Sequence, residues 1–348
     1  MRQRIVQIIK DRGPMVFDDY MEMCLYDPED GFFSAGPVRS GKKADFVTSP
    51  ELSWAFALCV GNWAEANRPS NDCALIEIGA GSGSLMANVR DVWESTSGQI
   101  YAVERSSAAR EALRRRFIDV NVVGSLDEIP RGIDAVVIAN EVLDNIPAAL
   151  AIRMEHGWFE IAVGLHDDEL GLAQVPAREE VVAWCDSIFD EVEEGVIVSV
   201  QLGVDRWISE LVEHLGSVAI CFIDYGDESK KLLANDVESV VRSYRQHRQG
   251  IDWLRVPGEC DITVDVNFTG VLAALRRAGL AARLSNQRAF CLEYGIVEVI
   301  ADARDREHFA ASLGNVMDQL RVRSERLDYE ALVDPNGLGA FKVLLVEP

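Results

Sequence analysis

Short apolar runs alternate with amphipathic stretches along most of this chain. Beyond a helical and loop-rich stretch of about 60 residues, the apolar runs predict five strands, at residues 74–76, 99–103, 120–123, 133–139 and 218–223. The stretches between them have helical spacing, most clearly at 84–93 and 107–116. Strands that alternate with helices are typical of a parallel, doubly wound sheet, so the pattern predicts an α/β fold.

Longer segments interrupt this alternation. A β-like stretch at 151–165 and a helix at 179–189 precede the fifth strand, and helices at 268–278 and 309–327 follow it. A final strand at 341–346 is expected to pair with the segment near 289–292. The length of 348 residues allows two domains, or one large domain with insertions. We expect an N-terminal helical segment (1–65), a core (66–150 and 215–348) and two insertions (151–214 and 227–265).

The turn after the first strand carries candidate chemistry. Residues 77–83 read Glu-Ile-Gly-Ala-Gly-Ser-Gly, and Ser84 stands where a dinucleotide-binding loop has its third glycine. Gly79, Gly81 and Gly83 allow the backbone to approach a ligand closely. An acid at Glu77 suits a ligand with an ammonium group better than one with phosphates. The loop therefore predicts S-adenosylmethionine, with a structural turn or a dinucleotide site as the alternatives.

A second acid supports this cofactor. Glu104 ends the next strand, about 20 residues beyond the glycines, where a carboxylate can accept hydrogen bonds from both ribose hydroxyls. The free N–H groups of the helix from Ser84 can bind the methionyl carboxylate. Glu77 is then placed to attract the methionyl ammonium.

Ligands of open α/β sheets bind beyond the carboxyl ends of the strands. Asn140, Glu141 and Asp144 follow the fourth strand, and Asp224 and Tyr225 follow the fifth. Their carboxylates could hold a cationic nucleophile and accept its proton. Each acid alone could equally be a helix cap or a solvated strand end. His247 is a further candidate, although its polar and aromatic segment, 243–248, could also be an exposed helix.

Composition limits the partners. The formal charge of −23 disfavours nucleic acid and suits a cationic substrate, or serves solubility alone. No apolar run reaches the ~18 residues of a membrane span. Seven scattered cysteines without a C-x-x-C pair indicate neither disulfides nor a metal site, and a cytoplasmic protein is the simplest expectation. The oligomeric state stays open.

Two elements of the chain are specific: Asp-Phe-x-Thr-Ser-Pro-Glu at 45–51 and Asn-Glu-x-x-Asp-x-x-Pro at 140–147. With several other segments, they resemble the MidA family of S-adenosylmethionine-dependent methyltransferases. This family includes a mitochondrial protein arginine methyltransferase that acts as a respiratory complex I assembly factor. The other matching segments are 20–33, 77–86, 223–226, 243–248, 261–268 and 337–344.

The resemblance implies a class I methyltransferase fold, Rossmann-like, with helical and β insertions that cover the substrate side. It implies that residues 45–51 fold over the cofactor and that the backbone of Ser125 and Leu126 binds adenine. The implied cofactor contacts are therefore Thr48, Ser49, Glu51, Glu77, Gly79, Gly81, Gly83, Glu104, Ser125, Leu126 and Asn140.

The chain also departs from the family. The usual Gly-Pro-Gly-Arg-Gly loop is Gly-Ala-Gly-Ser-Gly at 79–83, and Val122-Val123-Gly124 replaces a Trp-His-Asp triplet. The usual Asp-Ala-Leu-Pro is Asp-Asn-Ile-Pro at 144–147, so retention of the arginine substrate does not follow. We expect N-methylation of an arginine in a protein or peptide. The alternatives are N- or O-methylation of a small molecule or modified peptide, and a non-catalytic assembly protein that retains the cofactor fold.

Overall fold

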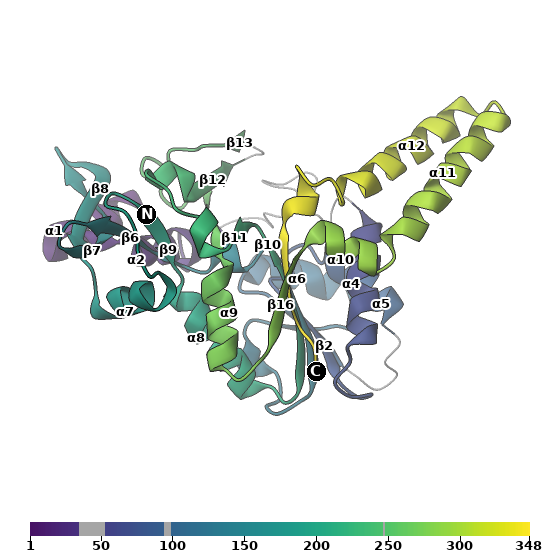
Figure 1. Ribbon diagram of the computed structural model, residues 1–348, viewed down its shortest axis with the longest axis horizontal. Helices are drawn as coiled ribbons and strands as arrows, with labels where there is room; N and C mark the ends of the chain where they lie inside the picture. Colours follow the sequence, from purple (N-terminus) through teal and green to yellow (C-terminus); the bar gives the residue numbers. More distant parts are fainter. Residues whose placement is uncertain (35–52, 94–98, 246–247) are drawn as a thin grey trace.

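A seven-stranded sheet forms the centre of the molecule (Figure 1). The computed structural model describes residues 1–34, 53–93, 99–245 and 248–348. The strand order is β16-β17-β10-β5-β2-β3-β4, and the five strands from β10 to β4 are parallel, as predicted. Their bounds are β2 Ala74–Ile78, β3 Ile100–Val103, β4 Asn121–Val123, β5 Ala135–Asn140 and β10 Val218–Asp224.

The last strand is present, but its expected partner was wrong. β17 (Lys342–Val346) runs antiparallel between β10 and β16 (Ala282–Asn286). The segment near 289–292 is instead helix α10 (Gln287–Glu293), begun by Asn286, whose side chain accepts a hydrogen bond from the Ala289 N–H. Because this cap begins a helix directly after β16, residues 287–293 are helical, and β16 is the segment that pairs with β17.

Alternate residues of the strands face two separate apolar layers. Leu75 and Val136 pack with α4 (Trp54–Ala66), α5 (Ser84–Val92) and α6 (Ser107–Arg116). Ile76 and Val137 face the other side, where α8 (Leu202–His214) and α9 (Phe268–Arg277) cover the sheet. This period of two, with helices on both faces, gives the three-layer arrangement of a doubly wound fold.

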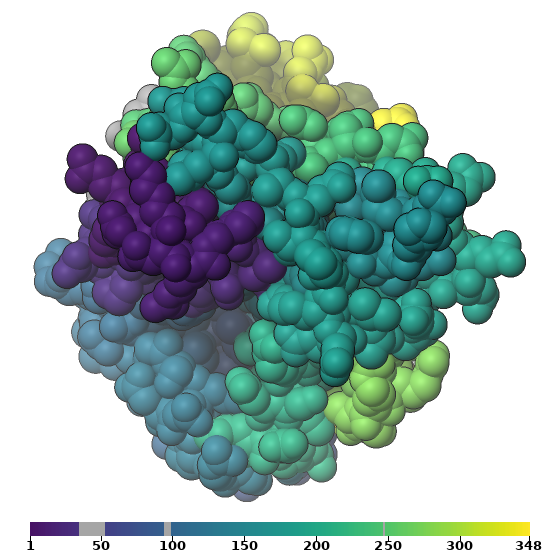
Figure 2. Space-filling model, turned by 90° about the vertical axis from the view of Figure 1, so that its left-hand side faces the viewer, coloured from purple at the N-terminus to yellow at the C-terminus, as the bar shows by residue number. Residues whose placement is uncertain are grey.

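The N-terminal segment and the insertions share a hydrophobic core of their own. Figure 2 shows the N-terminal residues, in purple, against the insertion, in teal. Five strands form one sheet there, and shorter strands pair beside it. The elements are α1 Arg2–Arg12, β1 Met15–Val16, α2 Phe17–Tyr26, β6 Ala149–Met154, β7 Gly157–His166, β8 Glu169–Pro176, α7 Glu179–Ile188, β9 Ile197–Val200, β11 Gly226–Asp227, β12 Val241–Arg245, β13 Arg248–Gln249, β14 Asp261–Val264 and β15 Val266–Asn267.

In the second half of the chain one alternative is excluded and one expectation fails. The described residues of the 243–248 segment are extended and not helical, because 243–245 lie in β12 and Arg248 lies in β13. The single helix expected at 309–327 is two helices, α11 (Ile296–Ser312) and α12 (Val316–Ala331). Gly314, with φ at 69°, reverses the chain between them, and α11 and α12 extend together away from the sheet (Figure 1).

The described residues include neither a membrane-spanning helix nor a cluster of metal ligands. No described helix is both long and apolar enough to span a bilayer. Within the same ranges, His, Cys, Asp and Glu side chains form no group of three or more that could hold a metal ion.

Candidate active site

A cavity of about 980 Å³ opens at the carboxyl ends of β2, β3 and β5. The glycine loop and the turns after β3, β4 and β5 form its floor, and α2 and α8 form its sides. Of the residues expected from the sequence, those on its wall are Glu77, Gly79, Gly81, Glu104, Ser125, Leu126, Asn140 and Glu141. Thr48, Ser49, Glu51 and His247 lie outside the described residues.

The glycine loop has the conformation that its sequence predicts. Gly79, Gly81 and Gly83 all have positive φ, at 70°, 51° and 74°. A Cβ on Gly79 would stand 2.6 Å from the Val142 side chain, and one on Gly83 would stand 2.6 Å from Leu113. Two of the glycines are therefore needed for packing against neighbouring turns and helices, in addition to their backbone angles.

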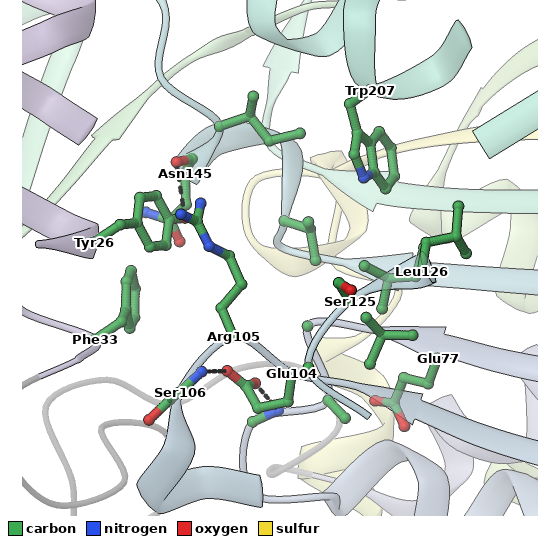
Figure 3. Close-up of a pocket in the computed structure, with 18 of the residues that line it drawn as sticks. Tyr26, Phe33, Glu77, Glu104, Arg105, Ser106, Ser125, Leu126, Asn145 and Trp207 are labelled. Atoms are coloured by element: carbon green, nitrogen blue, oxygen red, sulfur yellow. Dashed lines mark hydrogen bonds between the residues drawn. The ribbon is translucent and has the colours of Figure 1, made fainter. Parts of the chain in front are cut away.

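Glu77 lies buried at the end of β2 (Figure 3). Burial raises the pKa of its carboxyl from 4.5 to about 8, and the nearby Glu104 contributes to the rise. Its Oε2 atom has no hydrogen-bond partner among the described residues. A buried acceptor without a partner, on a cavity wall, fits a cationic ligand group such as an ammonium.

Glu104 holds the loops around it. Its Oε2 accepts a hydrogen bond from the Gly81 N–H at 2.9 Å, and its Oε1 accepts one from the Ser106 N–H at 2.7 Å. Burial nevertheless raises the pKa of this carboxyl. Each carboxylate oxygen can accept a further bond, so ribose binding stays a prediction. The sequence did not indicate this second role in fixing the glycine loop.

Glu141 has a backbone conformation that is uncommon outside glycine. Its φ is 53°, directly after β5, and its N–H donates to the Ile223 carbonyl at 2.8 Å. The Asn140 amide donates to the Glu141 carboxylate at 3.3 Å. Such backbone strain costs about 1–3 kcal/mol and clusters at functional sites. The strain, together with a place on the cavity wall, makes Glu141 the strongest catalytic candidate.

Asp224 is fully buried below the turn that follows β5, and it does not line the cavity. Its Oδ2 accepts the N–H groups of Val142, Leu143 and Asp144, at 3.1, 2.9 and 3.2 Å. Burial raises the pKa of its carboxyl well above the usual value, and the neighbouring Asp144 adds to the rise. The contacts place Asp224 as the support of this turn, whereas the sequence suggested a catalytic acid.

Asp144 and Tyr225 form a second buried contact behind the same turn. The Tyr225 hydroxyl donates to Asp144 Oδ2 at 2.5 Å, and neither residue lines the cavity. Burial raises the pKa of both groups. These side chains can fix the turn that carries Glu141, which is a positioning role, because they do not reach the cavity wall.

Four further residues on the wall were not predicted as site residues from the sequence. Tyr26 and Phe33 come from the N-terminal segment, Arg105 follows Glu104, and Trp207 lies on α8 at the opposite side (Figure 3). The Arg105 guanidinium stands 3.8 Å from the centroid of the Tyr26 ring and pairs with a glutamate of α2 at 3.0 Å. These residues are far apart in sequence, so only the fold brings them together.

The chain is similar to known methyltransferases in sequence. A family described as "Putative S-adenosyl-L-methionine-dependent methyltransferase" matches residues 57–286. The mitochondrial protein arginine methyltransferase NDUFAF7 of Rattus norvegicus is 27% identical, over 85% of this chain and 74% of its own. Its homologue in Caenorhabditis elegans is 26% identical, over 93% and 84% of the two chains.

Two solved structures have the same fold. A protein from Burkholderia thailandensis bound to S-adenosyl-homocysteine matches with a TM-score of 0.84 and 26% identity, over 99% of this chain and 91% of that chain. A second structure, from the same organism, matches with a TM-score of 0.81 and 25% identity, over 99% and 90% of the two chains.

One expectation is wrong in the light of these relatives. The scattered cysteines suggested a cytoplasmic protein, but the curated relatives are named mitochondrial. Cysteine usage reports only a reducing compartment and does not distinguish among such compartments.

The family match decides between the cofactors that the glycine loop left open. S-adenosylmethionine fits the wall, because its ammonium can meet the buried Glu77 carboxyl and its ribose can meet Glu104. The MidA resemblance and the class I methyltransferase fold are confirmed by the same findings. The family model covers most of the core, and the chain belongs to this family of S-adenosylmethionine-dependent methyltransferases.

Proposed function

We propose that this enzyme methylates a side-chain nitrogen of arginine in a protein or peptide. The observation that carries the proposal is Glu141, a carboxylate held at a strained backbone position on the cavity wall, beside Asn140. The relatives named protein arginine methyltransferases support the choice of acceptor.

A guanidinium is a planar cation that a single carboxylate can bind through two parallel N–H bonds. S-adenosylmethionine, when bound, supplies an electrophilic methyl group on a sulfonium. Glu141 would orient the acceptor nitrogen toward that methyl and take the proton that the nitrogen releases when the N–C bond forms and the methyl–sulfur bond breaks, with S-adenosyl-homocysteine as the leaving group. Positioning then supplies most of the rate, because methyl transfer is a direct displacement.

The sides of the cavity suit a cationic substrate. α2 contributes Asp18, Asp19 and Glu22, and α8 contributes Glu210 and Glu213. The basic residues of the wall are fewer and consist of Arg105, Arg131, Arg206 and His214. A surplus of carboxylates around a concave site raises the local concentration of cations, which favours an arginine-bearing peptide.

The cavity walls also indicate which segments of the chain face the substrate. We infer that the N-terminal segment (1–65) and the insertions (151–214 and 227–265) form the substrate side, over a core of 66–150 and 215–348. Support comes from α2 and α8, which lie in the first segment and the first insertion and line the cavity.

The test is transfer of a labelled methyl group from S-adenosylmethionine in a lysate of the native host, followed by mass spectrometry. Label on a peptide arginine, lost in Glu141→Gln and kept in Glu155→Gln, would support the proposal. Glu155 is an exposed acid outside the cavity wall, so it is a matched control.

Two other results would each overturn the proposal. Label on a small molecule would favour the small-molecule alternative. Cofactor binding without any transfer would favour a non-catalytic assembly protein.

A further inference from the structure

The side chain of Arg105 extends from beside Glu104, on the floor of the cavity, toward α2 at its side (Figure 3). Its guanidinium lies 3.8 Å from the centroid of the Tyr26 ring and pairs with the Glu22 carboxylate at 3.0 Å. Tyr26 and Glu22 both belong to α2, and both line the cavity. This part of the wall therefore already binds one guanidinium, which belongs to the chain itself.

Tyr26 is a fixed platform in the wall. Its ring stacks on Phe33, with the ring centroids 5.7 Å apart and the planes at 27°. Its hydroxyl donates to the Asn145 carbonyl at 3.0 Å, and the Asn145 amide donates to Asp261 at 2.9 Å. Asn145 lies in the same turn as Glu141, and both line the cavity. The aromatic face is thus tied by a hydrogen bond to the turn that carries the candidate catalytic carboxylate.

Arg105 is held weakly enough to be displaced. Its side chain is 58% exposed and that of Glu22 is 50% exposed. Ion pairs between exposed side chains contribute little, because water screens the charges and the side chains lose freedom when they pair. The backbone is held separately, since the Arg110 guanidinium donates to the carbonyls of Glu104 and Arg105 at 2.8 and 2.7 Å. Rotation of the Arg105 side chain alone would release Tyr26 and Glu22.

A planar cation suits this place best. A guanidinium can stack on the Tyr26 ring with its face while the N–H groups at its edge donate to carboxylates. An ammonium has no flat face and is more strongly hydrated. We propose that Tyr26 and Glu22 form the subsite for the guanidinium of the acceptor arginine, and that Arg105 occupies this subsite until the substrate displaces it. This inference rests on the proposed function and adds the residues that select arginine over lysine.

Binding of a blocked amino acid tests the subsite without requiring turnover. The probe is N-acetyl-arginine methylamide, titrated by NMR in the presence of saturating S-adenosyl-homocysteine. If Arg105 fills the subsite about 90% of the time, Arg105→Ala should bind the probe about tenfold more tightly than the wild type. The equivalent blocked lysine should gain far less. Adding Tyr26→Leu to Arg105→Ala should abolish the gain, because the stacking face is lost.

A matched arginine elsewhere provides the control. Arg90 pairs with Asp119 at 2.7 Å and lies over the Phe117 ring at 5.4 Å, and none of these residues is part of the cavity wall. Arg90→Ala loses the same kinds of contact, so its affinity for the blocked arginine should equal that of the wild type. An equal gain in Arg90→Ala would contradict the proposal, because the effect would not come from the cavity.

The remaining outcomes separate the subsite from the proposed function. If Arg105 only braces the two walls, Arg105→Ala should lower the thermal midpoint without any gain in affinity, which would overturn the proposal. An equal gain for the blocked lysine would also overturn it, since the subsite would then respond to charge alone. Labelling of peptide arginine in the lysate without the gain would keep the proposed function and refute the subsite. The gain without any labelling of arginine would support the guanidinium subsite and refute the proposed function.

Discussion

Replacing Glu77 by glutamine should remove a pH dependence of cofactor binding. Burial raises the pKa of Glu77 to about 8, so at pH 7 the free enzyme holds this carboxyl largely protonated. If the ammonium of the cofactor binds the carboxylate, binding must first ionise it, at a cost of about 1.4 kcal/mol per pH unit below the pKa. Affinity for S-adenosyl-homocysteine should then rise about tenfold per unit between pH 5.5 and 7, where an α-amino group of pKa roughly 7.7–8.0 stays charged.

Calorimetry measures this coupling directly. At pH 7 wild-type protein should release about 0.9 proton for each ligand bound, seen by comparing buffers of different ionisation enthalpy. Glu77→Gln should release far less, and its affinity should be nearly flat over the same range. A flat wild-type affinity without proton release would show that the ammonium does not bind Glu77. An unchanged slope in the variant would assign the proton to another group.

The same pKa shift predicts an effect on stability. Between pH 4.5 and 8 the folded protein binds more protons at Glu77 than the unfolded chain does, so its stability falls as the pH rises through this window. The full shift corresponds to about 5 kcal/mol. In urea titrations without ligand, the stability of Glu77→Gln relative to that of the wild type should therefore increase up to pH 8. Above pH 8 the difference between the two proteins should be constant. An equal difference in stability between the variant and the wild type at pH 5 and at pH 8 would contradict the buried acid of raised pKa that we describe.

Four further variants, at three positions, test the neighbouring residues. Glu104→Gln should weaken cofactor binding at least tenfold in calorimetry and also lower the thermal midpoint, because it loses a charge-assisted bond worth about 1.5–3 kcal/mol; an unchanged midpoint would refute its role in holding the loop. Glu141→Gln should lower turnover at least tenfold in a methyl-transfer assay with little change in cofactor affinity, while Glu141→Gly should be inactive yet about 1 kcal/mol more stable in urea; full activity of either variant would move the acceptor site elsewhere. Tyr225→Phe should cost about 1–3 kcal/mol in urea unfolding, because Asp144 loses its hydroxyl partner in the interior, and an unchanged stability would count against that contact.

The sequence predicted those parts of the fold that depend on local pattern. The run at 74–76 and its counterparts alternate between two apolar layers, so their spacing alone indicated a buried sheet. The partner of β17 depends on which segments meet in space, and the Asn286 cap decided it against the expected pairing. Gly314 is one residue in a long helical pattern, and only the packing of α11 on α12 shows that it ends a helix.

In the candidate site, too, some residues could be predicted from the sequence and others could not. Glu77 and Glu104 were found because strand ends next to a glycine loop have a known chemical meaning. Asp224 looked equally suitable, yet its carboxylate supports a turn, since three N–H groups from a neighbouring loop converge on it. The positive φ of Glu141 has no sequence signature, because it results from the bonds that tie the turn to the next strand.

The position of β17 within the sheet has a consequence for folding. β17 is an inner strand between β10 and β16, although it is synthesised after both of them. Until residues 342–346 leave the ribosome, the parallel strands have an unpaired edge along β10, and the surface beside it can recruit other chains. Closure of the sheet therefore waits until residues 342–346 have been synthesised. Aggregation on the ribosome is the hazard that this topology creates, and chaperones that shield exposed strand edges are the expected remedy.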